Sequence, residues 1–441
     1  MARKTRWVVG LATLLAGAAA AEVPMDRQLA QEDRIAELER TVQVLADELE
    51  RTRTEMAVPE ERDLEGAYGL GPAASKIYGV AQGLSLGGYG EGVYQHYFRD
   101  PGDKSDRWDQ LRTVLYVGYK FSDRIVFNSE FEFEHATTSS TESAGGGSAS
   151  VEFAALDFFV RDWANARAGL LLVPMGFINE VHEPTSFYGV LRPDVETQII
   201  PSTWRENGAG VFGRLFDDRV EYRMYAVTGL NAAGYTSSNL RDGRQKGNRA
   251  LAEDMAFTAR VDWFPFDPLT VGGSVFVGNA GQDQVLDPGV ALPDAMTTLW
   301  EAHAQYESHG LHLRGLFTMA HIDDAGALTT ALRIAGNIGA TETIASRMLG
   351  GYAEIAYDLM PLLRPMSEMS LTPYYRFEYY DTQDEVPSGF SADPKKEIWN
   401  HTFGFQFKPI PNVVLKTDVR LRDAKAGNVA DEFNLGFGFA F

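Results

Sequence analysis

The chain has 441 residues and a formal net charge of −21, and it contains 43 glycines, 26 phenylalanines and no cysteine. The acidic balance argues against partners such as nucleic acid and against docking on anionic lipid. The lack of cysteine excludes a disulfide framework and a thiolate metal site. With a mean hydropathy just below zero, the composition is typical of a β protein with aromatic surfaces.

The first 21 residues predict a secretory signal peptide. Arg3, Lys4 and Arg6 form a basic start, an apolar stretch follows, and three alanines at 19–21 suit cleavage. The alternative, a transmembrane anchor, is disfavoured because the apolar run is well short of the roughly 20 residues that a spanning helix needs. The sequence therefore predicts an exported protein.

Residues 22–56 predict a periplasmic coiled-coil segment. Ile35, Leu38, Val42, Leu45 and Leu49 follow one another at spacings of three and four, which makes an apolar seam. The alternative is one amphipathic helix packed on its own domain. Residues 57–77 are rich in proline and glycine and predict a linker.

After residue 78 the apolar period becomes two. In "RTVLYVGYKFSDRIVFNSEFEFEHA", residues 112–136, two alternating segments flank Ser122-Asp123, which predicts a hairpin with one apolar and one charged face. The same unit recurs along the chain. We expect about sixteen strands: 84–98, 107–121, 124–136, 150–161, 165–173, 206–216, 219–228, 254–264, 268–278, 296–307, 311–322, 347–357, 370–382, 397–408, 412–422 and 432–441.

The connections alternate between tight turns such as "LFDDR" and long polar loops such as "TTSSTESAGGGSAS". This layout is typical of an outer-membrane β-barrel, and only a closed barrel pairs all its backbone groups in lipid. The prediction is an all-β transmembrane antiparallel barrel over residues 78–441, preceded by a short helical coiled coil. A soluble β-sandwich is the alternative, but its strands are usually shorter.

The last expected strand, "DEFNLGFGFAF", alternates large apolar side chains with small ones. We expect Phe433, Leu435, Phe437, Phe439 and Phe441 to face lipid. A strand that ends on an aromatic resembles the assembly signal of outer-membrane barrels. That resemblance implies that the barrel assembly machinery is a partner through Phe441.

Charged residues at inward positions of the expected strands predict the lining of a pore. The candidates are Arg112, Lys120, Arg124, Glu130, Glu132, Glu134, Arg223, Arg260, Arg314, Arg376, Lys416 and Arg420. Further inward acids, among them Asp262, Glu378 and Asp418, give the lining both signs of charge.

Residues 174–213 interrupt the strand rhythm yet are too apolar for an external loop. Long loops in compact folds are usually functional, and a loop folded into a lumen narrows it. We expect a constriction formed by His182, Arg192, Glu196, Arg205 and Glu206, with the arginines opposite the acids. The alternative is that these charges hold the loop to the barrel wall by ion pairs.

The stretches "LDFFVRDWANARAG", "LLVPMGFINEVHEP" and "IIPSTWRENGAGVFG" resemble the phosphate-selective porin O/P-type family. The resemblance covers residues 78 to 441 and implies a homotrimer of sixteen-stranded barrels with the third long loop folded inward. Anion-selective members carry a ladder of basic residues in the pore. The many inward acids of this chain depart from that pattern, so phosphate selectivity is not carried over.

The sequence favours an outer-membrane porin, a passive channel for small hydrophilic solutes and ions, with no cofactor. Lipid, lipopolysaccharide and further copies of the chain are its expected partners. Three alternatives stay open: an anion-selective porin, a barrel enzyme, and an envelope tether whose coiled coil contacts the cell wall. An enzyme is disfavoured because P-loop and H-E-x-x-H strings are absent and because His309 and His312 have no companion acids for a metal site.

Overall fold

The computed structural model describes residues 34–48, 65–139 and 146–441. The chain divides into two compact units, residues 1–63 and residues 64–441. In the first unit, residues 34–48 form an α-helix whose seam residues Ile35, Leu38, Val42 and Leu45 are exposed. The helix is confirmed, whereas its association into a coiled coil stays a prediction. The expected signal peptide lies outside the described residues.

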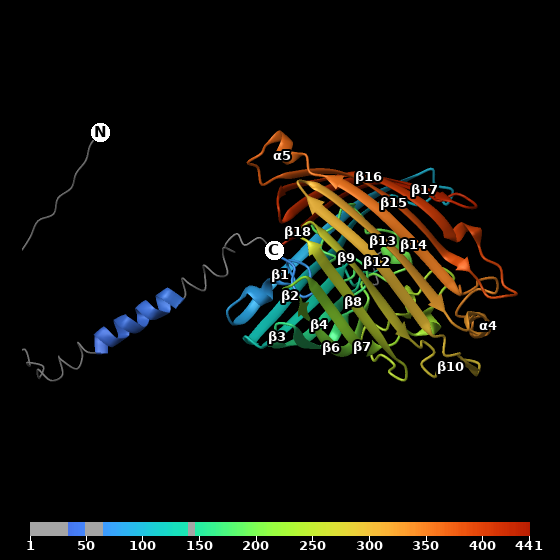
Figure 1. Cartoon of the computed structure of the whole chain (residues 1–441), viewed down its shortest axis with the longest axis horizontal. Helices are drawn as coiled ribbons and strands as arrows, with labels where there is room; N and C mark the ends of the chain where they lie inside the picture. The colour runs from blue at the N-terminus through green and yellow to red at the C-terminus, as the bar shows by residue number, and fades with distance from the viewer. Residues whose placement is uncertain (1–33, 49–64, 140–145) are drawn as a thin grey trace, which may run out of the picture. The chain divides into compact units, whose positions relative to one another are not determined.

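The second unit is a closed antiparallel barrel of sixteen strands, ordered β1-β18-β17-β16-β15-β14-β13-β12-β9-β8-β7-β6-β5-β4-β3-β2 (Figure 1). The strands are β1 Gly83–Phe98, β2 Arg107–Ser122, β3 Ile125–Glu134, β4 Ala149–Arg161, β5 Ala164–Leu172, β6 Arg205–Leu215, β7 Val220–Thr228, β8 Met255–Phe266, β9 Leu269–Gly278, β12 Thr297–Ser308, β13 Leu311–Ile322, β14 Arg347–Tyr357, β15 Ser370–Glu385, β16 Glu397–Ile410, β17 Val413–Ala424 and β18 Asp431–Ala440. The predicted fold class is confirmed. Among the described residues, none of the helices has the length and apolar character needed to cross a membrane.

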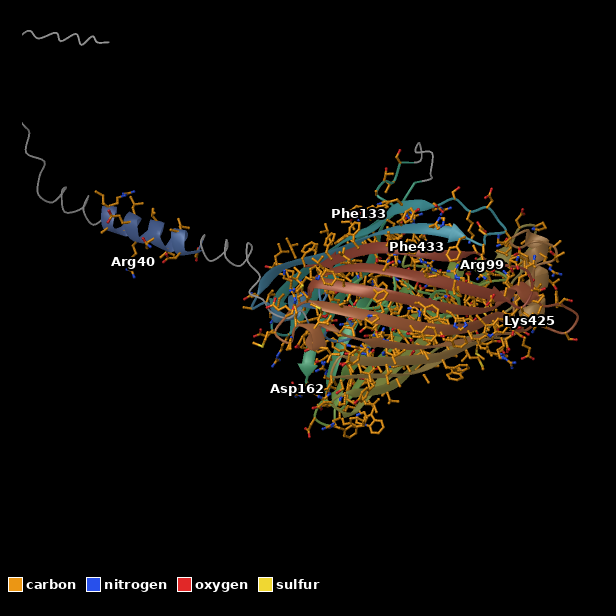
Figure 2. The ribbon with its side chains drawn as sticks, turned by 90° about the horizontal axis from the view of Figure 1, so that it is seen from above. Arg40, Arg99, Phe133, Asp162, Lys425 and Phe433 are labelled. Carbon is orange, nitrogen blue, oxygen red and sulfur yellow. The ribbon has the colours of Figure 1, made fainter. Side chains whose placement is uncertain are left out.

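The two faces of the wall differ in polarity, as the period of two requires. On β3, Phe131 and Phe133 are 37% and 48% exposed, while Glu130 and Glu132, which alternate with them, are 0% and 2% exposed. Phe133 and Phe433 project from the outer surface in Figure 2. An apolar outer face and a charged inner face are the arrangement of a transmembrane barrel.

The connections separate into two ends. Tight turns such as Asp123–Arg124 and His309–Gly310 lie at one end, here the short-turn end, together with α5 (Met360–Leu363). The other end, here the long-loop end, carries α4 (Ala325–Ala335) and the small sheet of β10 (Val285–Leu286) and β11 (Val290–Ala291) (Figure 1). Figure 2 shows Asp162 at the short-turn end, with Arg99 and Lys425 at the long-loop end.

The barrel closes between β1 and β18 by stacking aromatic rings on glycines. Gly90 pairs with Phe439 and Gly92 pairs with Phe437 in the strand register. A Cβ placed on Gly90 would lie 2.7 Å from the Phe439 ring, and one on Gly92 would lie 2.5 Å from the Phe437 ring. Each ring therefore covers the backbone that its partner glycine leaves bare. We call these two pairs the closing seam.

The segment before β1 packs on the inner wall near its short-turn end, where Ile77 lies against Gly118 and Asn128 donates to Ala74 O. It includes α2 (Lys76–Gly79), and Leu70, Ala73, Ala74 and Ile77 are buried there. The segment of the predicted linker that the structure describes thus packs within the barrel unit. We call residues 65–79 the N-terminal plug segment.

Candidate functional site

Residues 173–204 connect β5 to β6 and cross the barrel interior; we call them the inner loop. Its two ends are fastened together at Asn179. The Asn179 Nδ2 donates to the carbonyl oxygens of Val173 and Trp204 at 2.7 and 2.9 Å, and its Oδ1 accepts from Trp204 N at 2.7 Å. Because one buried amide satisfies three backbone groups, the loop leaves and rejoins the wall at one place.

An apolar core holds the near part of the inner loop to the wall. Met175, Ile199, Ile200 and Trp204 are buried in one cluster, and the Trp204 ring lies 4.5 Å from the ring of Phe276 on β9. This burial explains why the segment is too apolar for an external loop.

The far part of the loop reaches β17, across the ring from β6. Lys416 Nζ donates to Phe187 O at 2.8 Å, and Val190 N donates to Asp418 Oδ2 at 2.6 Å. Arg420 donates to Asp194 at 3.0 Å. Burial alone would raise the pKa of Asp194, but Arg420 and Arg422 hold that pKa below its usual value. The loop therefore contacts the wall on both sides of the interior.

Four of the five residues expected to form a constriction have partners on the wall. His182 Nε2 lies 3.2 Å from Glu130 of β3, and Glu196 accepts from Tyr352 of β14 at 2.7 Å. Arg205 and Glu206 belong to β6 rather than to the loop, because the strand begins at Arg205. Arg205 pairs with Glu152 at 2.6 Å, and Glu206 accepts from Thr228 at 2.8 Å. The contacts of His182 and Glu196 thus join the loop to the wall, whereas those of Arg205 and Glu206 join neighbouring parts of the wall itself.

Arg192 differs from the other four. Within the described residues, its Nη2 is buried and has no hydrogen-bond partner. Burial and the neighbouring Arg112 lower the pKa of Arg192, although an arginine remains charged at neutral pH.

Most of the expected lining residues lie on the inner wall, where the basic ones pair with acids of the same wall. Arg112 pairs with Glu91 at 3.1 Å, Arg223 with Asp262 at 2.8 Å, and Arg376 with both Glu354 and Glu378 at 3.1 and 3.0 Å. The buried members of the predicted set are Arg112, Glu130, Glu132, Arg223, Arg260, Arg376, Lys416 and Arg420. Glu134 and Arg314 are half-buried on the same face.

One residue of the expected lining, Arg124, lies off the inner wall, and Lys120 lies at its edge. Arg124 is exposed in the turn between β2 and β3, so its assignment to the lining was wrong. The turn extends one residue beyond Ser122-Asp123, which takes Arg124 out of the strand. Lys120 ends the inner face of β2, and its Nζ donates to Val80 O at 3.0 Å.

Sequence reasoning missed the contact between the plug segment and the inner loop. The amides of Ala73 and Ala74 donate to the Glu183 carboxylate at 2.9 and 3.1 Å. Burial raises the pKa of Glu183 to about 7, although both amides favour the ionised form. The available signal was the string "YGLGPAAS" at residues 68–75, whose small residues allow a close approach.

A basic group lies at the long-loop end. Arg244 is buried and its Nη1 donates to the carbonyl and hydroxyl oxygens of Thr203 at 3.0 and 2.9 Å. Burial, together with Arg241 and Arg205, lowers the pKa of Arg244 to about 9. These three arginines and Lys246 lie close enough to repel one another.

His309 and His312, the histidines considered for a metal site, have different partners in the described residues. His309 bonds Ser308 in a turn, while His312 pairs with Glu307 at 3.3 Å. In the described part of the chain, no group of three or more His, Cys, Asp or Glu residues could hold a metal ion.

A sixteen-strand barrel with an apolar outer face and a charged inner face defines a transmembrane β-barrel with the porin fold. OmpF of Salmonella typhi, solved with daunomycin, is 12% identical; the match covers 82% of this chain and 98% of OmpF, with a TM-score of 0.52. OmpT of Vibrio cholerae, folded in vitro, is 10% identical over 82% of this chain and 98% of that one, with a TM-score of 0.50. Both likenesses concern the fold.

No family model matches the chain. A protein of Aquifex aeolicus (strain VF5), described as uncharacterized, is 37% identical over 380 residues, which cover 85% of this chain and 83% of the relative. This chain belongs to the same family as that protein.

Proposed function

We propose that this protein is an outer-membrane porin, a channel for passive diffusion of small hydrophilic solutes and ions that the inner loop narrows. The observation that supports it best is the closed sixteen-strand wall with charged residues inside and apolar residues outside. Barrels of sixteen to eighteen strands enclose an aqueous channel rather than a side-chain core. The barrel lies in the outer membrane, the helix of residues 34–48 in the periplasm.

The test is single-channel recording of the purified full-length protein in a planar bilayer. We expect discrete conductance steps, and reversal potentials in a salt gradient give the ion selectivity. Heat-denatured protein in the same detergent is the control for detergent leakage. Folded protein that inserts but carries no current at any voltage or pH would contradict the proposal.

Anion selectivity is the second candidate, as the resemblance to the phosphate-selective O/P-type family implies. Two features favour it: the unpartnered buried Nη2 of Arg192 and the basic group of Arg205, Arg241, Arg244 and Lys246. The paired acids on the wall reduce the field that these cations produce. Reversal potentials decide between the two candidates.

An enzymatic role has less support. The pentapeptide GLSLG, residues 83–87, fits the G-x-S-x-G pattern of hydrolases, but Ser85 lies within β1 and pairs with Gly118 in the strand register. The nucleophile of that pattern needs a sharp strand-to-helix turn. The glutamates of β3 accept from, or pair with, His182 and Arg112, so a structural role accounts for them.

We further propose a homotrimer, which the resemblance to the O/P-type family implies. The exposed seam of the helix of residues 34–48 supports association of chains, but it does not fix their number. Replacing both Leu38 and Leu45 by Asp is expected to dissociate this segment, because charges at seam positions oppose helix pairing. Sedimentation of a peptide of residues 26–55 gives the measurement, and replacing Glu37 and Glu48 by Gln outside the seam is the matched control. A wild-type peptide that stays monomeric at high concentration would exclude the coiled coil.

A further inference from the structure

We propose that residues 65–79 act as a movable plug, which docks on the inner loop and closes the short-turn end of the channel. The inference rests on the proposed channel function. It assigns a gating role to a segment whose proline and glycine content predicts a linker.

The docking contact is built from small residues that face acids of the inner loop. A Cβ on Gly71 would lie 2.5 Å from Glu183 Oε1. One on Gly69 would lie 2.1 Å from Arg223 Nη1 of β7 and 2.7 Å from Glu180 Oε1. Gly69 also has a φ of +82°, which L side chains rarely adopt. The segment thus fits the loop so closely that side chains at these two positions would prevent docking.

The plug also contacts the wall beside the loop. Tyr78 donates to Asp157 of β4 at 2.6 Å, and Arg167 of β5 donates to Tyr68 O at 3.2 Å. The Tyr68 ring packs 5.2 Å from Phe159 and 5.5 Å from Phe212. Asn128 of β3 donates to Ala74 O at 2.8 Å. The plug therefore covers the inner wall from β3 to β6 at this end.

The attachment can be released without unfolding the barrel. The plug belongs to no barrel strand, so its withdrawal breaks none of the sixteen strand pairings. Gly83, at the junction with β1, has a φ of +98° and open space around the position of a Cβ. This junction is a suitable hinge because hinges are a few residues at the ends of elements.

Proton binding at Glu183 favours the docked plug. Burial raises the pKa of Glu183 to about 7 in the docked state and outweighs the Ala73 and Ala74 amides, which lower it. Withdrawal of the plug removes both the amides and the part of the burial that the plug provides, so on this proposal the pKa falls back toward its ordinary value. Between these two pKa values, Glu183 is protonated when the plug is docked and ionised when the plug is withdrawn. Docking is strongest below pH 4.5 and weakens as the pH rises through 7. The titratable groups that face Glu183 are His182 on the loop, Glu130 on β3 and Tyr116 on β2.

The test uses the variant Ile77→Cys/Gly118→Cys, which ties the plug to β2. A Cβ on Gly118 would lie 2.9 Å from Ile77 Cβ, slightly under the disulfide range of about 3.5 to 4.5 Å. The chain has no other cysteine. We expect the oxidised variant to stay closed at pH 8 and the reduced variant to open. The two single-cysteine variants are the controls for substitution alone.

Two further variants release the plug or remove its pH dependence. Gly71→Val, which crowds Glu183, should stay open at pH 5. Wild-type protein should raise its open-to-closed ratio by about tenfold or more between pH 5 and pH 8, and Glu183→Gln should lose this rise. Heat-modifiable migration on gels confirms that each barrel is folded.

The outcomes separate the two proposals. Closure of the oxidised pair with opening on reduction supports the plug. If the oxidised double-cysteine variant conducts like its reduced form, the plug proposal is wrong and the channel proposal is unaffected. Folded wild-type, reduced and Gly71→Val proteins that all fail to conduct overturn the channel and the plug together.

Discussion

Replacing both Gly90 and Gly92 of the closing seam by valine is expected to prevent barrel assembly. The new side chains would lie within 2.7 and 2.5 Å of the Phe439 and Phe437 rings, and overpacking of this kind costs about 1–3 kcal/mol at each site. Strands β1 and β18, which must pair to close the barrel, would then clash. The measurement is the amount of heat-modifiable protein in outer membranes and after refolding into detergent.

A control and a rescue make this prediction specific. Gly315 also faces outward, but a Cβ there would lie 3.6 Å from its nearest neighbour, Tyr352 O; Gly315→Val should therefore assemble normally. The exchange variant Gly90→Phe/Phe439→Gly places one ring over one glycine again and should recover part of the yield lost in Gly90→Val. Normal assembly of the glycine double variant would refute a role for ring stacking at the seam.

Replacing Arg376 by methionine is expected to lower the free energy of unfolding by about 3–5 kcal/mol, the usual cost of removing one partner of a buried ion pair. Arg376 is 1% exposed and lies between Glu354 and Glu378. Without the guanidinium, two buried carboxylates face each other uncompensated. Urea unfolding in lipid vesicles, followed by tryptophan fluorescence, gives the measurement.

The matched control removes all three charges at once. Glu354→Gln/Arg376→Met/Glu378→Gln leaves no unpaired charge, so most of the lost stability should return, because neutral replacement of a whole buried network is often tolerated. If Arg376→Met alone unfolds like the wild type, the triad does not stabilise the wall, and the arginine faces solvent in the working channel.

The strands could be predicted because alternation is a local property. Phe131 and Phe133 alternate with Glu130 and Glu132 in the sequence, and a strand sends alternate side chains to opposite faces. Turn residues such as Ser122-Asp123 then bounded the strands. Arg124 was wrongly assigned to the pore lining because strand boundaries are uncertain by one or two residues, and a shift of one residue moves it from the strand to the turn.

The partners of the inner charges could not be predicted in the same way. Arg376 meets Glu354 because β14 and β15 pair in one particular register, and the sequence pattern alone does not give that register. The plug was harder still, because Ala73 meets a carboxylate 110 residues further along the chain. Glycine and proline in that segment indicate a lack of regular structure, but they do not distinguish a free linker from a docked one.

The pairing of β1 with β18 has a consequence for the order in which the barrel folds. Every other strand pair joins consecutive barrel strands, whereas this one joins the first to the last. The entropy lost in closing a loop grows with its length, and contacts between distant residues form late. The ring-on-glycine contacts are therefore the last to form, and before that step the open sheet has two unpaired edges, each able to pair with another chain. Because the edges of β1 and β18 fit each other, the open sheet persists for a shorter time and has less opportunity to pair with another chain.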